Sequence, residues 1–149
     1  MKRFLLLVLA VAAALISTGL ASSQTGAGSP ATVAVARTKL GLILVDGKGR
    51  TLYDFVKDKS TTSTCYDACA ALWPPLFTKG KPHAGHGVRA SLLGTTKRRD
   101  GKLEVTYNRH PLYFYVADSK PGQTTGQGLN QFGAPWWVLN AAGKEIHRG

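Results

Sequence analysis

An internal duplication constrains the fold of this chain more than any other feature of its sequence. The segment LYDFVKD at residues 52–58 returns sixty positions later as LYFYVAD at 112–118, with Leu, Tyr, Val and Asp in the same places. A second segment, ALWPPL at 71–76, is echoed by APWWVL at 134–139. One copy of about sixty residues would be marginally stable alone, whereas two copies packed face to face share a core. The sequence therefore predicts two repeats that pack together.

Strand and turn signals dominate both repeats. Short apolar, β-branched or aromatic runs recur, and several are joined by residues typical of tight turns. Asp100-Gly101 is a strong hairpin signal, and Asp46-Gly47-Lys48-Gly49 indicates a second hairpin. The predicted strands cover residues 42–45, 51–56, 95–99, 103–107, 112–116, 136–140 and 144–147. Many short strands with regular turns predict an all-β fold, a compact antiparallel β domain built from two sequence repeats.

One short helix is expected within this strand pattern, near Cys65–Leu72. The segment is rich in alanine and is stopped by Pro74-Pro75, because proline removes a backbone donor and clashes with the preceding turn. The remaining length is close to the commonest domain size. We therefore expect a single duplicated β domain over residues 32–149, with repeats at about 41–78 and 101–147.

The N-terminus has the order of a secretory signal peptide. Lys2 and Arg3 precede an apolar run from Phe4 to Ile16, and small residues follow. This run is shorter than the roughly twenty residues that a membrane span needs. We expect a signal peptide at 1–21 and a disordered tether at 22–31, where Ser, Gln, Thr and Gly cannot form a core. The mature chain is predicted to be secreted or periplasmic, with no transmembrane segment after cleavage.

The net charge of the chain indicates which kinds of partner it can bind. Without residues 1–21 the chain keeps 17 Lys and Arg against 8 acidic residues, a net charge of +9. Outside the cytoplasm such a surface meets anionic lipids, acidic wall polymers or polysaccharides rather than nucleic acid. The one tight basic cluster, Lys97-Arg98-Arg99, is interpreted as a solvated strand or loop face. The partners expected are anionic envelope material or an apolar small molecule, and no nucleic acid.

Cys65 and Cys69 are the only cysteines. In an exported protein an even, minimal count predicts a disulfide. Their spacing matches neither a c-type haem site nor a thioredoxin-like pair, and four zinc ligands cannot be assembled locally. His83 and His86 could contact one metal ion, but the glycines around them indicate a flexible turn with exposed side chains. We therefore expect no cofactor and no metal.

The aromatic residues of the duplicated segment are candidates for a shared core. Side chains alternate along a strand, so Tyr53 and Phe55 share one face, as do Tyr113 and Tyr115. These two pairs are predicted to occupy equivalent places about an approximate twofold. Each tyrosine hydroxyl is expected to reach a polar partner at the rim of the core.

Asp58 and Asp118 lie three residues after the second aromatic of each copy, where the predicted strand ends. Two interpretations are open. The carboxylates converge on a site across the pseudo-twofold, or each accepts backbone N–H bonds in the turn that it opens, at 59–60 and at 119–122. Because Asp commonly accepts such turn bonds, the second interpretation is favoured.

The combined motifs resemble a known family. The pattern Tyr-x-(Phe/Trp/Tyr)-x-x-Asp occurs at 53–58 and 113–118, accompanied by CYDACAALWPPL, RRDGKLEVTYNRHPLYFYVAD and PGQTTGQG. This set is similar to the bacterial family of secreted repeats and predicted lipoproteins that the motif defines, over nearly everything from Gly41 onward. The resemblance implies an exported protein and links some members to hydrocarbon breakdown. The lipid-bearing cysteine of the lipoprotein members is missing.

No catalytic motif emerges from the sequence. It has no Gly-x-Ser-x-Gly elbow and no phosphate loop, and none of its four histidines lies in a triad context. We therefore expect no catalytic residues and no enzyme, and the leading hypothesis is a non-enzymatic binding or scaffolding module of the cell envelope. One open alternative is a carrier of apolar, hydrocarbon-related small molecules. The other is a redox or metal-handling accessory protein that uses Cys65, Cys69, His83 and His86.

Overall fold

The computed structural model describes residues 28–149. The predicted signal peptide and most of the predicted tether lie outside the described residues. Across residues 28–149, no helix is long and apolar enough to cross a membrane. Short strands, mostly in antiparallel pairs, dominate this part of the chain, so the predicted all-β fold class is confirmed.

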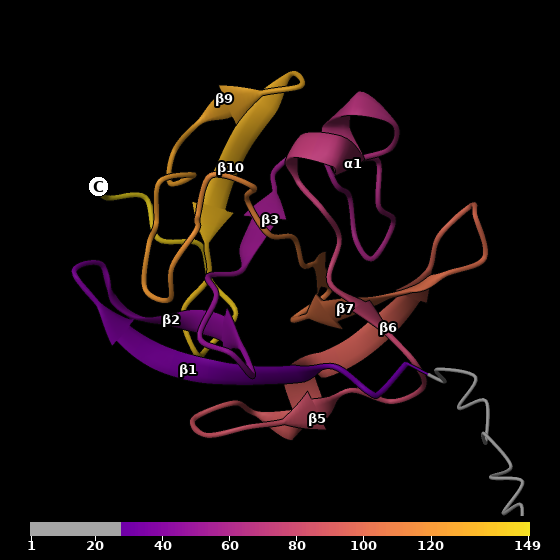
Figure 1. The fold of residues 1–149 in the computed structure, drawn as a ribbon, viewed down its shortest axis with the longest axis horizontal. Helices are drawn as coiled ribbons and strands as arrows, with labels where there is room; N and C mark the ends of the chain where they lie inside the picture. The colour runs from indigo at the N-terminus through magenta and orange to yellow at the C-terminus, as the bar shows by residue number, and fades with distance from the viewer. Residues whose placement is uncertain (1–27) are drawn as a thin grey trace, which may run out of the picture.

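The described strands form three small sheets (Figure 1). The buried apolar residues form two clusters, and each cluster contains residues of both repeats. The strands are β1 (Thr32–Thr38), β2 (Gly41–Asp46), β3 (Tyr53–Phe55), β4 (Phe77–Thr78), β5 (His83–Ala84), β6 (Leu93–Lys97), β7 (Leu103–Tyr107), β8 (His110–Pro111), β9 (Asn130–Gln131) and β10 (Ala134–Val138). Their orders are β2-β1-β5, β3-β10-β9 and β4-β7-β6, with β8 paired to β7. The helical elements are α1 (Ala68–Leu72) and the 3-10 helix η1 (Ala90–Leu92).

Each repeat contributes one antiparallel hairpin, β1–β2 in the first and β6–β7 in the second. The predicted Asp100-Gly101 turn joins β6 to β7, and Gly101 has a φ of 81°, a conformation that glycine adopts at little steric cost. Each hairpin then bonds to the other repeat. Leu44 donates its N–H to the carbonyl of Leu139, and Val105 donates to that of Leu76, both at 2.9 Å. The two hairpins are therefore equivalent in position.

The repeats exchange segments with each other. β3 of the first repeat pairs with β10 of the second, while Tyr113 of the second repeat bridges to Pro75 of the first. Tyr53 and Tyr113 also pair directly, each donating its N–H to the other's carbonyl at 2.8 and 2.9 Å. Tyr53 and Tyr113 thus bond to each other in the same way from both repeats, as the predicted twofold requires.

A column of four stacked aromatic rings occupies the middle of the core. Phe55 stacks on Trp136 at 4.0 Å between ring centroids, Trp136 on Trp73 at 4.0 Å, and Trp73 on Tyr115 at 4.3 Å. The two tryptophans lie in the middle of the column, and each end is the second aromatic residue of one repeat's motif, Phe55 or Tyr115. Aromatic pairs of this kind stabilise a fold by about 0.5–1.5 kcal/mol beyond the area they bury.

Three predicted elements differ from the structure. Residues 144–147 were expected to form a strand, but Glu145 makes only an isolated bridge to Leu139 there. Residues 112–116 were expected to form a regular strand, but Tyr113 makes only isolated bridges there. Pro74 accepts from the N–H of Phe114 and has no N–H of its own to return a second bond. The predicted helix is shorter than expected: α1 begins at Ala68, after Asp67 with a φ of 52°. β1 was not predicted, although Val33 and Val35 alternate along it.

Candidate functional site

The repeated tyrosines and aspartates bind across the two repeats. The Tyr53 hydroxyl donates to Oδ2 of Asp118, and the Tyr113 hydroxyl donates to Oδ2 of Asp58, both at 2.6 Å. Each aspartate therefore accepts from the tyrosine of the other copy. Hydrogen bonds to a charged acceptor are shorter and stronger than neutral ones, so these two bonds tie the repeats together.

The second oxygen of each aspartate organises the loop that follows. Oδ1 of Asp58 accepts the N–H and the hydroxyl of Thr64 at 2.8 and 2.6 Å. Oδ1 of Asp118 accepts the same two groups of Thr125 at 2.9 and 2.5 Å. The aspartates thus accept backbone N–H bonds as favoured, but from a threonine six or seven residues away instead of from the turns at 59–60 and 119–122.

Burial raises the pKa values of both tyrosines and of Asp58. Removal from water raises the pKa of both Tyr53 and Tyr113, and the neighbouring carboxylates raise it further, so both hydroxyls stay protonated donors. Burial also raises the pKa of Asp58, against the bonds from Thr64 and Tyr113 that favour its charged form. Neither tyrosine is suited to lose its proton at neutral pH.

A buried polar network extends from the Asp58 end only. Arg98 donates from Nη1 to Oγ of Ser63 at 2.5 Å, and the Ser63 hydroxyl lies 2.6 Å from that of Tyr113. Arg98 also donates from Nη1 to Oε2 of Glu104 at 2.8 Å and from Nη2 to the carbonyl of Cys65 at 2.6 Å. The interpretation of Lys97-Arg98-Arg99 as a solvated face is therefore wrong for Arg98, whose side chain is 2% exposed.

Glu104 is the least satisfied member of this network. Its side chain is fully buried, and its Oε1 has no hydrogen-bond partner. Burial raises its pKa to about 7, because the penalty for removing a carboxylate from water outweighs the stabilisation from Arg98. The sequence did not indicate this residue, since nothing in β7 distinguishes it from an exposed strand position.

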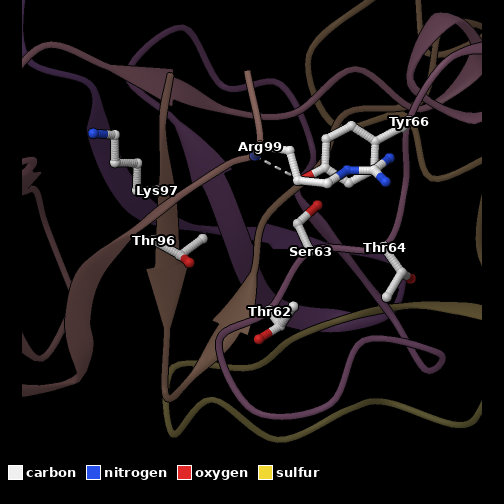
Figure 2. Close-up of a pocket in the computed structure, with 7 residues that line it drawn as sticks. All are labelled: Thr62, Ser63, Thr64, Tyr66, Thr96, Lys97 and Arg99. Carbon is white, nitrogen blue, oxygen red and sulfur yellow. Dashed lines mark hydrogen bonds between the residues drawn. The ribbon is translucent and has the colours of Figure 1, made fainter. Parts of the chain in front are cut away.

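A cavity of about 300 Å³ lies beside the network, between β6 and the loop that Asp58 organises (Figure 2). Its hydroxyl-bearing residues are Thr62, Ser63, Thr64, Tyr66 and Thr96. Its basic residues are Lys97 and Arg99. Figure 2 shows the Arg99 guanidinium over the ring of Tyr66, with 3.9 Å between Cζ and the ring centroid. Cations and hydroxyl donors in one cavity suit an anionic oxygen ligand.

The predicted disulfide is present between Cys65 and Cys69, whose Cα atoms are 5.2 Å apart. It adjoins the buried polar network, since the Cys65 carbonyl accepts from Arg98. His83 and His86 have exposed side chains, as expected, and their backbones bind β1 through Ala31 and Val35. The histidine pair thus helps to attach β5 to β1.

The family suggested by the motif is confirmed. The family described as a secreted repeat of unknown function matches the chain over residues 34–77 and 94–140, which is more than half of its length. The chain belongs to this family of secreted repeats, and the membership indicates an extracytoplasmic location. No curated protein and no solved structure matches the chain.

Proposed function

We propose that the protein is a non-enzymatic binding module of the cell envelope that holds anionic polymers through the cavity beside Asp58. The observation that carries this proposal is the exchange of bonds between the repeats. Asp58 and Asp118 accept from three donor groups each, so the carboxylates that the duplication repeats are engaged in the fold. A general acid or base needs a proton that it can exchange with a substrate.

The cavity offers what such a polymer would bind. Lys97 and Arg99 are exposed, and five residues with hydroxyl groups line the same cavity. The ring of Tyr66 lies against both Arg98 and Arg99, at 4.1 and 3.9 Å from Cζ to the centroid. An arginine already stacked on an aromatic ring loses less side-chain freedom when it binds a phosphate or carboxylate. The net charge of the mature chain favours the same ligands.

The redox alternative receives little support from the cysteines. Cys65 is fully buried and Cys69 is 7% exposed. Thiol–disulfide exchange requires that an attacking thiolate reach a sulfur atom, and this burial restricts such access. The bridge is better explained as a clamp on the loop that carries Ser63 and Thr64.

An apolar carrier would need space between the aromatic rings. Trp73 and Trp136 are fully buried and stack at 4.0 Å, which is van der Waals contact. A ligand could enter this column only if the rings separated, and separation would remove the contacts that hold the repeats together. The basic cavity is therefore the better supported site.

Sedimentation with isolated cell envelope tests the proposal. The mature protein is expected to cosediment at low salt and to be released as salt rises, because exposed charges are screened. Lys97→Gln with Arg99→Gln should reduce the bound fraction severalfold. The matched control, Lys79→Gln with Lys81→Gln, removes the same charge from exposed residues that do not line this cavity, and it should bind nearly as well.

Three results would overturn the proposal. The first is no binding at low salt, and the second is an equal loss in both double variants, which would assign the adhesion to diffuse charge. The third concerns catalysis. If Asp58→Asn with Asp118→Asn removed a measurable turnover while the fold stayed intact, the protein would be an enzyme.

A further inference from the structure

Three side chains that are distant in sequence meet at a second place in the molecule. Asp54 lies in β3, His110 in β8, and Glu145 in the C-terminal segment that bridges back to Leu139. One ligand atom from each of the three lies within 4.8 Å of the others. Nδ1 of His110 is 3.0 Å from Oδ2 of Asp54. The fold has therefore brought one imidazole and two carboxylates to a common point.

Asp54 is the unusual member of this group. Its side chain is 1% exposed. Oδ2 pairs with Nδ1 of His110 at 3.0 Å, but Oδ1 is buried without a hydrogen-bond partner. A buried polar group without hydrogen bonds destabilises a fold, and a buried carboxylate oxygen does so strongly. His110 compensates this carboxylate at one oxygen, and a cation held between the three side chains would also satisfy Oδ1.

The fold itself does not require an acid at this position. Tyr53 and Tyr113 are equivalent, so the residue after each is equivalent too, and Phe114 stands in the second repeat where Asp54 stands in the first. Phe114 has an ordinary packing role, with the Arg50 guanidinium 4.0 Å above its ring. Since one repeat functions with an apolar ring there, the carboxylate of the other is not explained by architecture.

We propose that Asp54, His110 and Glu145 bind a divalent transition-metal ion of the zinc class. One imidazole nitrogen with two carboxylate oxygens is a ligand set that zinc accepts, whereas calcium and magnesium favour oxygen alone. Bonds of about 2.0–2.2 Å place tetrahedral ligands roughly 3.4 Å apart, so a movement of about 1 Å closes the group around an ion.

Two of the three side chains are partly exposed, which leaves them room to move and gives the ion a path from solvent. The side chains of His110 and Glu145 are 32% and 24% exposed, while Asp54 is held inside. The ion would approach from the solvent side and meet the buried carboxylate last. Glu145 also contacts Nε2 of His147 at 2.5 Å, which keeps its carboxylate at the rim of the group. This site is separate from the basic cavity, and the inference does not depend on the proposed function.

Titration calorimetry of the mature protein with Zn²⁺ tests the inference. We expect one ion per chain, and Asp54→Asn and His110→Gln should each weaken binding by at least about tenfold. The matched control is His83→Gln with His86→Gln, which removes the other histidine pair and should leave the affinity unchanged. Ca²⁺ and Mg²⁺ at the same concentration should not compete.

A thermal measurement separates a metal ligand from a residue needed for folding. Zn²⁺ should raise the unfolding temperature of the wild-type protein and leave that of Asp54→Asn unchanged, since only binding to the folded state stabilises it. Without metal, Asp54→Asn should still fold, because the partner that it leaves, His110, is 32% exposed and can be solvated by water. Absence of Zn²⁺ binding, loss of binding in the control variant, or full competition by Ca²⁺ would overturn the inference.

Discussion

The two tyrosine–aspartate bonds that join the repeats are equal in length and differ in what surrounds them. At the Asp118 end, the Tyr53 hydroxyl has one further partner, the N–H of Gly126 at 3.2 Å. At the Asp58 end, the Tyr113 hydroxyl meets Ser63 and, through it, the charged side chain of Arg98. The Asp118 end therefore adds one backbone donor to the bond, whereas the Asp58 end is connected through Ser63 to the buried ion pair of Arg98 and Glu104.

The difference shows which parts of a duplicated domain are free to diverge. Both ends keep the bond between repeats, because losing either would open the shared core. Around that bond the second repeat gained Glu104 where the first has Ile43, since each directly precedes the residue that bonds to the other repeat. The loop after Asp58 gained a disulfide, and the basic cavity formed beside it. New chemistry was thus added at one end of a symmetric frame.

The largest effect is expected from Arg98→Met, measured by urea denaturation at pH 8, where Glu104 is ionised. Breaking a buried pair leaves an uncompensated charge, so the free energy of unfolding should fall by about 3–5 kcal/mol. Adding Glu104→Ile, which restores the residue of the first repeat, should recover most of the loss. If the double variant is as unstable as the single one, Arg98 matters through Ser63 and Cys65 instead.

The second effect is a dependence of stability on pH. The pKa of Glu104 rises from 4.5 unfolded to about 7 in the folded protein, so the folded state binds more protons over this range. Its contribution is complete below about pH 4.5 and is lost as pH rises through about 7, a change of roughly 3 kcal/mol. Glu104→Gln should flatten this part of the profile. Parallel profiles for the two proteins would contradict the assignment.

The third effect concerns the disulfide, which occurs at the Asp58 end alone. Cys65→Ala with Cys69→Ala should lower the free energy of unfolding by about 2 kcal/mol, because the loop that the bridge closes is short. Thiol titration of the unfolded, unreduced wild-type protein should find no free thiol. Two reactive thiols, or a variant that fails to fold, would count against this modest, local role.

The smallest effect compares the two hydroxyls directly. Tyr113→Phe should cost about 1 kcal/mol more than Tyr53→Phe, because it removes short hydrogen bonds to both Asp58 and Ser63. Tyr53→Phe removes one short bond, to Asp118, and a longer one from Gly126. Thermal unfolding of the two single variants and the double variant measures this difference. Equal losses would mean that the network adds nothing to the bond between repeats.

Local signals in the sequence predicted several features correctly. Asp100-Gly101 indicated the β6–β7 hairpin, because this dipeptide adopts the turn without strain. The cysteine count indicated the disulfide, since two cysteines in an exported protein meet an oxidising environment. β1 could also have been found, because Val33 and Val35 alternate with smaller residues in a way typical of a strand.

Other features could not be read from local pattern. Arg98 lies between two basic residues and looks solvated, yet Glu104 and Ser63 bury it from two different segments. Asp54 looks like a polar strand position, and its neighbours come from far along the chain. Ser63 and the neighbours of Asp54 come close only through chain folding, so the sequence around each residue carries no trace of them. Glu104 is different, because it lies six residues from Arg98, across the predicted Asp100-Gly101 hairpin.

Two facts can be read from the sequence alone: the chain carries two copies of one motif, and each copy supplies aromatic residues to a core. The bonds between the copies are visible only in the folded chain, where Tyr53 binds Asp118 and Tyr113 binds Asp58. Identical motifs offer identical local bonds, so neither motif indicates whether its tyrosine binds the aspartate of its own copy or of the other. In the fold Tyr53 and Tyr113 pair directly, and each hydroxyl reaches the aspartate of the other repeat.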